Sequence, residues 1–470
     1  MTVEPDEVWI LMSTMKAFGV ALPLTSAVDN PVTTTGGLHF LLHGLISLAW
    51  GGNILVHRLA SIAAVLILLG LVFKILERQV NKRVVAFAGT ALFATAPGFL
   101  LQASLATAEI LATLAFLLAA LHWIYFGSRS MGMAVLGGIF FGVACATRMT
   151  CLSMLPAIFV WSLFTQRCWH ARVFYPLLAI AVAGLVFIGF MAIYFSAFGG
   201  ASWQEYLTVN GLSSGLGKPF PGIMMRLNYL AVVDGIIPAL ALISLAGWFV
   251  SQLHAKKNDN EVLGVCGFLL LAGSAGWLSW VLRAPIPHIR YLWPSIPLFW
   301  LVVILLSASA LERVTQPRTL MIAHISIVLM CAAQGLLNMR LLAVGDSLTL
   351  VYEIARESTL GTPQNFFVAR NTQNEMANVL ASLPATANIY AIQEAAAYPM
   401  TYLSNRTIKS LRQATKASDL DYLLVQPYDR SIWLPRWNLI GWLQSNTTLK
   451  GRRGEYELYQ VREGVSLPLP

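Results

Sequence analysis

The chain has 470 residues, of which 57% are hydrophobic and only 11% are charged. A soluble globule of this length needs more polar surface, so the composition excludes a soluble protein and predicts an integral membrane protein. Lysine and arginine number 31 against 22 aspartates and glutamates, which gives a formal net charge of +9. The excess lies in the hydrophobic part, where the positive-inside rule and anionic headgroups explain it without a nucleic acid as partner.

Two apolar segments near the N-terminus, residues 9–28 and 36–50, are short or interrupted by polar residues. Both are predicted to be helices that lie in the membrane interface rather than spanning it. The second segment contains His39 and His43, whose spacing of four residues is also used by metal ligands. Without a third ligand nearby, these histidines are expected to be headgroup-level residues and not a metal site.

From residue 59 onward, apolar runs approach the roughly 20 residues that a helix needs to cross a bilayer. They predict an α-helical polytopic bundle with about ten spans. The predicted spans are 59–75, 84–101, 108–126, 131–146, 152–164, 173–195, 227–250, 262–281, 291–308 and 320–343.

Lysines and arginines gather in alternate connections between these runs, as in the stretch from Lys74 to Arg83. The positive-inside rule places this richer set of connections in the cytoplasm. With an even number of spans, the acidic N-terminus, the loop 199–226 and the tail are then expected together on the outer face.

The chain is predicted to divide into a membrane domain, residues 1–344, and a soluble extracytoplasmic α/β domain, residues 345–470. The tail lacks long apolar runs and shows helical and strand patterns instead. Its predicted elements are a helix at 373–383, buried strands at 387–392 and 422–426, and a half-exposed strand at 455–461.

Charged side chains are rare in the membrane domain outside the predicted cytoplasmic connections, and charged residues there are usually functional. Carboxylates and cations occur together at the predicted outer ends of the spans. This combination suits transfer of a sugar from a lipid-linked phosphate, because a carboxylate can deprotonate the acceptor and arginines can neutralise the leaving phosphate. The residues are Asp6, Glu7, Glu109, Asp234, Arg58, Arg148, Lys218, Arg226, Arg283 and Arg290.

Several motifs follow one another in a fixed order over the first 300 residues. They are Asp6-Glu7, Asn30-Pro31, Gly52, Arg58-Leu59-Ala60-Ser61, Ala96-Pro97-Gly98-Phe99, Ala106-Thr107-Ala108-Glu109, the run from Gly142 to Arg148, and the run from Arg290-Tyr291 to Pro297. This order resembles the GT-C superfamily of polyprenyl-phosphate-sugar glycosyltransferases. More narrowly, it resembles the dolichyl-phosphate-mannose protein mannosyltransferase-like branch, which includes the bacterial lipid A aminoarabinose transferases.

The resemblance implies an inverting glycosyltransferase of the bacterial inner membrane, with its active site on the extracytoplasmic side and without a metal or other cofactor. By position, Asp6 would be the catalytic base, Glu7 its partner and Arg58 a contact to the donor phosphate. The further substrate-binding residues implied by the motifs are Glu109, Arg148, Arg290 and Tyr291.

The implied partners are a polyprenyl-phosphate-linked sugar donor, a lipid, glycan or protein acceptor, and membrane lipids. Two other functions stay open, a transporter or flippase for a lipid-linked saccharide and an inactive GT-C scaffold. A transporter is expected to show repeat symmetry and charges near the bilayer midplane, and neither is visible in the sequence. For Arg148 and Arg283, extension to lipid headgroups is an alternative to phosphate binding.

Overall fold

The structure is a computed structural model, and its description is confined to part of the chain. The described residues are 37–79, 83–96, 108–166, 168–197, 260–283, 293–312, 370–392, 394–411, 420–426, 437–453 and 456–465, with the shorter stretches 11–12, 14–15, 18, 99, 318, 321–322, 325–333, 429 and 434.

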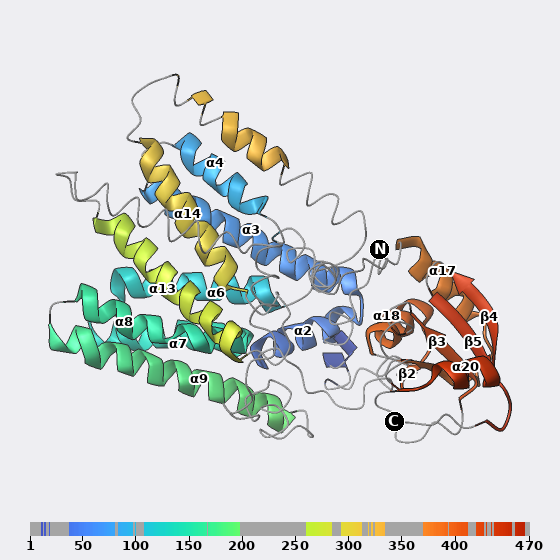
Figure 1. Ribbon diagram of the computed structural model, residues 1–470. Coiled ribbons are helices and arrows are strands. Elements are labelled where there is room, and N and C mark those ends of the chain that lie inside the picture. Colours follow the sequence, from blue (N-terminus) through green and yellow to red (C-terminus); the bar gives the residue numbers. More distant parts are fainter. Residues whose placement is uncertain are drawn as a thin grey trace.

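The membrane domain is a bundle of apolar helices (Figure 1). Its α-helices are α2 (Gly37–Trp50), α3 (Ile54–Gln79), α4 (Arg83–Ala94), α6 (Ala108–His122), α7 (Met131–Thr147), α8 (Pro156–Thr165), α9 (Tyr175–Ala197), α13 (Asn260–Arg283) and α14 (Ser295–Glu312). Shorter helical turns are the π-helices η2 (Trp123–Gly127) and η4 (His170–Phe174) and the 3-10 helix η3 (Met149–Met154).

Among the described residues, three helices are long and apolar enough to cross a membrane, namely Ile54–Gln79, Ala108–Gly127 and His170–Ser196. They coincide with three of the predicted spans, and the chain is therefore an integral membrane protein. Some of the other apolar helices are shorter, such as α4 with 12 residues. The predicted span 227–250 lies outside the described residues, so the total of about ten spans stays a prediction.

Two predicted spans begin at other residues than the hydropathy suggested. The run expected over 152–164 is divided into η3 and α8, and α8 begins at Pro156. In the run expected over 291–308, helix α14 begins at Ser295, directly after Pro294. Proline has no N–H donor and is tolerated in the first turn of a helix but not in its interior, so prolines fix these helix starts.

Helix α3 is apolar on both its inner and its outer face. Leu68 and Val72 are fully buried in the bundle core, whereas Leu59 and Leu66 are 61% and 65% exposed. A soluble protein rarely shows such exposed apolar surface in quantity. The outer face of α3 is therefore suited to contact with lipid.

Helices α7 and α9 pack closely against each other. A Cβ atom at Gly138 would lie 2.6 Å from the carbonyl oxygen of Ala179, and one at Gly142 would lie 2.5 Å from Cβ of Val186. Only glycine allows the two backbones to approach so closely, as is common between membrane helices. This close packing holds the C-terminal end of α7, which precedes Arg148, in a fixed place.

The tail forms a mixed five-stranded sheet with the order β2-β1-β3-β5-β4. Strands β1, β2 and β3 are parallel, and β5 is antiparallel to both β3 and β4. The predicted helix at 373–383 and the two predicted buried strands are confirmed. The elements are α17 (Arg370–Ala381), β1 (Ile389–Ala391), α18 (Glu394–Ser404), β2 (Ile408–Ser410), β3 (Tyr422–Val425), α20 (Ile440–Asn446), β4 (Thr447–Arg453) and β5 (Tyr456–Val461).

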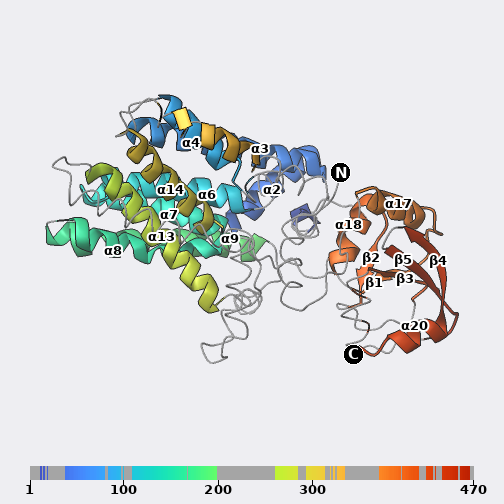
Figure 2. The same cartoon turned by 45° about the horizontal axis from the view of Figure 1, so that its top comes forward.

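The strand predicted at 455–461 is confirmed as β5, but the prediction that it is half-exposed is wrong, because five of its six residues are buried. Strand β5 is central in the sheet, and helices α17 and α20 lie on opposite sides of that sheet (Figure 2). Leu458 packs with α17 and α18 on one face, and Tyr459 packs with α20 on the other. Glu457 is also buried, and the Tyr459 hydroxyl donates a hydrogen bond of 2.7 Å to its carboxylate.

The tail packs against the start of α3. The backbone N–H of Ile54 donates a hydrogen bond of 3.2 Å to the Tyr402 hydroxyl of α18. Ile54, Leu11 and Met12 share one buried cluster with tail residues such as Met400. The tail therefore lies at the Ile54 end of the bundle (Figure 1), while the predicted domain boundary at 344/345 is outside the described residues.

Candidate active site

A buried ion pair joins α6 to the end of α7. Nη2 of Arg148 lies 3.0 Å from Oε1 of Glu109, and both side chains are at most 3% exposed. Arg148 caps the C-terminus of α7, and Glu109 lies in the first turn of α6, where the helix dipole favours a negative charge. The alternative in which Arg148 extends to lipid headgroups is excluded by its burial.

The carboxylate of Glu109 is directed into the protein rather than toward an open surface. Glu109 is 1% exposed, and its second oxygen, Oε2, has no hydrogen-bond partner among the described residues. A carboxylate that is salt-bridged and buried in this way is a poor general base for an incoming hydroxyl group. Its geometry fits a residue that orients the cation beside it.

Three histidines form a second buried group, where α2 meets α3. Nδ1 of His43 and Nδ1 of His57 are 2.6 Å apart, and the rings of His39 and His43 have centroids 4.2 Å apart. The hydroxyl of Ser47 donates to the carbonyl of His43 at 2.8 Å and lies 3.4 Å from Nε2 of His57. These side chains are almost fully buried.

The expectation that His39 and His43 are headgroup-level residues is wrong. Helix α2 packs against α9 at Gly37, where an added Cβ would lie 2.9 Å from the carbonyl oxygen of Phe190. Residues four apart share one face of a helix, and this packing turns the His39/His43 face inward. In the part of the chain that the structure describes, no group of three or more His, Cys, Asp or Glu side chains is arranged to hold a metal ion.

The histidine group and the ion pair influence each other electrostatically. Burial, and then the positive charge of Arg148, lower the pKa of His39 to about 3, so this residue of the short helix α2 is neutral at pH 7. Neither ring nitrogen of His39 has a hydrogen-bond partner among the described residues. The buried polar region consists of His39, His43, Ser47, His57 and the Glu109–Arg148 pair.

Arg58 follows His57 in α3 and is half-buried. The same end of α3 carries Ile54, which contacts the tail. Arg58 thus lies near the start of α3, next in sequence to His57 of the buried polar region.

Four of the predicted site residues, Asp6, Glu7, Arg290 and Tyr291, lie outside the described residues. Sequence reasoning missed His57 and Ser47 as members of the polar region. The available signal was the presence of three histidines within two adjacent apolar helices, because histidine is uncommon in such segments.

One family model matches the chain, that of dolichyl-phosphate-mannose-protein mannosyltransferase, over residues 37–194. This stretch runs from the start of α2 into α9 and contains Arg58 and the whole buried polar region. No curated protein matches the chain in sequence at a significant level.

Solved structures of ArnT from Cupriavidus metallidurans share the fold. The form bound to undecaprenyl phosphate has a TM-score of 0.55 at 13% identity and covers 100% of this chain and 95% of that chain. The apo form has a TM-score of 0.57 at 14% identity and covers 97% and 93%. An oligosaccharyltransferase from Archaeoglobus fulgidus, tethered with an acceptor peptide, has a TM-score of 0.47 at 12% identity and covers 100% and 72%.

The apolar helices and the fold shared with ArnT define a polytopic membrane protein. Residues 37–194 carry the sequence pattern of the dolichyl-phosphate-mannose-protein mannosyltransferase family. The resemblance predicted from the ordered motifs is confirmed by these two findings.

Proposed function

We propose that this chain is a membrane glycosyltransferase that moves a sugar from a polyprenyl-phosphate donor to a lipid, polysaccharide or protein acceptor on the outer face of the membrane. The observation that carries the proposal is the family match over residues 37–194, which encloses the buried polar region. The fold shared with ArnT, whose solved form binds undecaprenyl phosphate, supports the same donor class. The proposed location is the bacterial inner membrane.

The proposed reaction is an inverting displacement at the anomeric carbon of the sugar. Asp6 takes the proton of the acceptor hydroxyl, and Glu7 assists it. The acceptor oxygen forms the new glycosidic bond as the bond from the anomeric carbon to the phosphate oxygen breaks. Arg58 stabilises the negative charge that develops on the leaving polyprenyl phosphate. No metal or other cofactor takes part in this scheme.

Arg148, Arg290 and Tyr291 complete the proposed substrate-binding set, together with Glu109. Arg148 already shares a buried contact with Glu109, so a donor phosphate that reached Arg148 would compete with that carboxylate. We propose that the pair holds the ends of α6 and α7 in register around the donor phosphate site. Its loss would then weaken donor binding even where no direct contact is made.

The proposal is tested by transfer of a labelled sugar from a polyprenyl-phosphate donor by the purified full-length chain. Asp6→Asn keeps the side-chain shape but removes the base, and turnover should fall by about 10²–10⁴-fold with donor binding nearly intact. Asp29→Asn, which changes another carboxylate near the N-terminus, is the matched control and should retain activity. Full activity of Asp6→Asn would contradict the assignment of the base to Asp6.

The natural acceptor is identified by mass spectrometry of envelope glycolipids and glycoproteins from a deletion strain and its parent. One glycan should lose a sugar in the deletion strain. If no glycan changes and the purified chain moves a lipid-linked saccharide across vesicles, the chain is a flippase. If neither activity is found, it is an inactive scaffold.

The proposed sidedness has its own test. The distribution of lysine and arginine places the tail outside the cytoplasm. A cysteine introduced by Ser418→Cys should therefore react with a membrane-impermeant maleimide added to intact cells. Protection of that cysteine in intact cells, with labelling after permeabilisation, would reverse the sides.

A further inference from the structure

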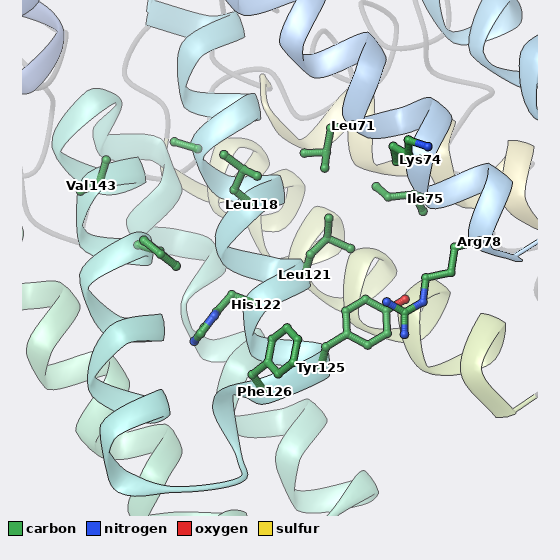
Figure 3. Close-up of a pocket in the computed structure, with 12 residues that line it drawn as sticks. Leu71, Lys74, Ile75, Arg78, Leu118, Leu121, His122, Tyr125, Phe126 and Val143 are labelled. Carbon is green, nitrogen blue, oxygen red and sulfur yellow. The ribbon is translucent and has the colours of Figure 1, made fainter.

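A groove lies between α3, α6 and α7 at the end of the bundle away from the tail. Its volume is about 490 Å³, which is in the range of sites for single small ligands. Most of its lining is apolar, with Leu71 and Ile75 from α3, Leu121 from α6 and Val143 from α7 (Figure 3). An elongated apolar group fits this lining.

The groove opens sideways toward the lipid-facing surface of the bundle. Three of its lining residues are also exposed on the outside: Leu118 is 45% exposed, Phe126 42% and Phe140 37%. Because these side chains lie on helices of the membrane domain, the opening faces the acyl chains of the bilayer. A lipid chain can enter it without leaving the hydrocarbon.

One end of the groove is basic and aromatic. Figure 3 shows the Arg78 side chain beside the ring of Tyr125, with the guanidinium carbon 4.1 Å from the ring centroid. Nε2 of Gln79 donates a hydrogen bond of 3.1 Å to the Tyr125 hydroxyl and holds the ring in place. A guanidinium group stacked on a ring directs its N–H donors along its edge, which is the geometry that binds phosphate.

The local charge around this end is positive. Lys74 lines the groove, and its Nζ lies 2.6 Å from Glu77, which is also 3.0 Å from Arg83. Arg129 lies over the Phe126 ring at 5.0 Å. The described residues within 74–83 and 127–130 include one carboxylate, Glu77, and four cations, which are Lys74, Arg78, Arg83 and Arg129.

The groove and the candidate active site lie at opposite membrane interfaces. Arg58 and Arg78 are 20 residues apart on α3, which corresponds to about 30 Å at about 1.5 Å per residue. This distance matches the thickness of the hydrocarbon core, also about 30 Å. The basic end of the groove is thus at headgroup level in the leaflet that the lysine-rich connections predict to be cytoplasmic.

The end of α6 is shaped around the groove by a π-helical turn. Residues Trp123–Gly127 form η2, which carries both Tyr125 and Phe126 into the lining. Such turns are rare and are frequently found at functional sites. His122, just before η2, also lines the groove and has Nε2 3.1 Å from the carbonyl oxygen of Met133.

We propose that this groove binds one anionic glycerophospholipid of the leaflet, with its phosphodiester between Lys74 and Arg78 and an acyl chain along Leu71, Leu118 and Leu121. Attraction to the basic end favours an anionic headgroup over a zwitterionic one, since basic residues near a membrane surface attract anionic lipid. The proposal does not depend on the sugar or acceptor of the proposed transferase.

The test is native mass spectrometry of the full-length chain in detergent, titrated with phosphatidylglycerol or phosphatidylcholine of equal chain length. The wild-type chain should bind phosphatidylglycerol the more tightly. The double variant Lys74→Ala/Arg78→Ala should lose about tenfold or more of that affinity, as expected when charged contacts are removed. Leu118→Trp, which fills the groove without changing charge, should reduce binding of both lipids.

Arg172→Ala is the matched control, because Arg172 is an exposed basic residue of η4 and does not line the groove. It should bind phosphatidylglycerol as the wild type does. The proposal is overturned if the double variant and Leu118→Trp both bind phosphatidylglycerol normally, or if Arg172→Ala weakens binding as much as they do. Displacement of the phospholipid by polyprenyl phosphate at equal concentration would assign the groove to that lipid instead.

Discussion

The two ends of α3 use charge in opposite ways. At the Ile54 end, His57 is buried against His43, and the neighbouring Glu109–Arg148 pair is almost fully enclosed. At the other end, Lys74 is 72% exposed, although it too is paired with a carboxylate. Burying a charge costs several kcal/mol, whereas an exposed one costs little.

The difference separates charges that the protein needs for its own structure or chemistry from charges that contact the membrane surface. Charges that are kept despite the cost of burial have a structural or catalytic purpose. Charges at headgroup level fit the positive-inside rule and contact with anionic lipid. The following variants test this contrast, in order of expected effect.

The largest effect is expected for Glu109→Gln. Glu109→Gln breaks the buried ion pair with Arg148, and loss of one partner of a buried pair should lower the free energy of unfolding by about 3–5 kcal/mol. Thermal unfolding of the detergent-solubilised chain can be followed by reaction of a maleimide dye with the buried free thiols Cys145 and Cys151. Replacing Arg148 by methionine in the same chain should recover part of the loss.

Glu77→Gln is the control at the other end of α3. Glu77 pairs with Lys74 and Arg83, whose side chains are 72% and 85% exposed, and such surface pairs often contribute nothing measurable. This variant should unfold at the temperature of the wild type. Equal losses for Glu109→Gln and Glu77→Gln would show that burial does not separate the two ends.

A smaller effect is expected for Arg58→Ala, measured as donor affinity. Loss of a charge-assisted phosphate contact should weaken binding of the polyprenyl-phosphate donor by about 1.5–3 kcal/mol. Arg58→Lys keeps the charge and should lose less. Arg78→Ala, at the opposite end of the same helix, should leave the KM for the donor unchanged, and a KM raised equally by both alanine variants would contradict the assignment of the donor site.

The smallest effect is expected for Tyr402→Phe, which removes the acceptor for the Ile54 N–H. A single neutral hydrogen bond contributes about 0.5–1.5 kcal/mol, so the unfolding temperature should fall slightly. Tyr422→Phe is the control, because Tyr422 packs against the same cluster from β3. If the two variants have the same unfolding temperature, the hydrogen bond between Ile54 and Tyr402 does not stabilise the described structure.

The helical segments and the two buried strands of the tail could be predicted from the sequence because they depend on local patterns. Apolar runs such as Ala108–His122 form helices in hydrocarbon, where every backbone N–H and C=O must be paired within the segment. The ordered motifs also predicted the fold, because they mark helix ends in the order that this architecture requires. Helix starts were less predictable, because Pro156 and Pro294 act on single residues within a longer apolar run.

The site was predicted only as a set of residue types. Arg58, Glu109 and Arg148 were selected because charge is costly in a membrane, and this argument holds for each residue alone. It does not reveal partners, so the pairing of Glu109 with Arg148 and of His43 with His57 was not foreseen. The same limit applies to β5. Its alternating sequence predicted one solvent-exposed face, but the strand lies inside the sheet with helices on both sides and is buried.

Composition and apolar patterning by themselves determined that this chain enters a membrane, that it is helical there and that a mixed α/β unit follows. These properties depend on the transfer of each segment from water, which is a sum over local residues. Only the tertiary structure decided which charges are buried, which histidines meet and where a groove remains open to lipid. Those properties depend on contacts between helices far apart in the sequence, and close packing such as that of α7 on α9 fixes them.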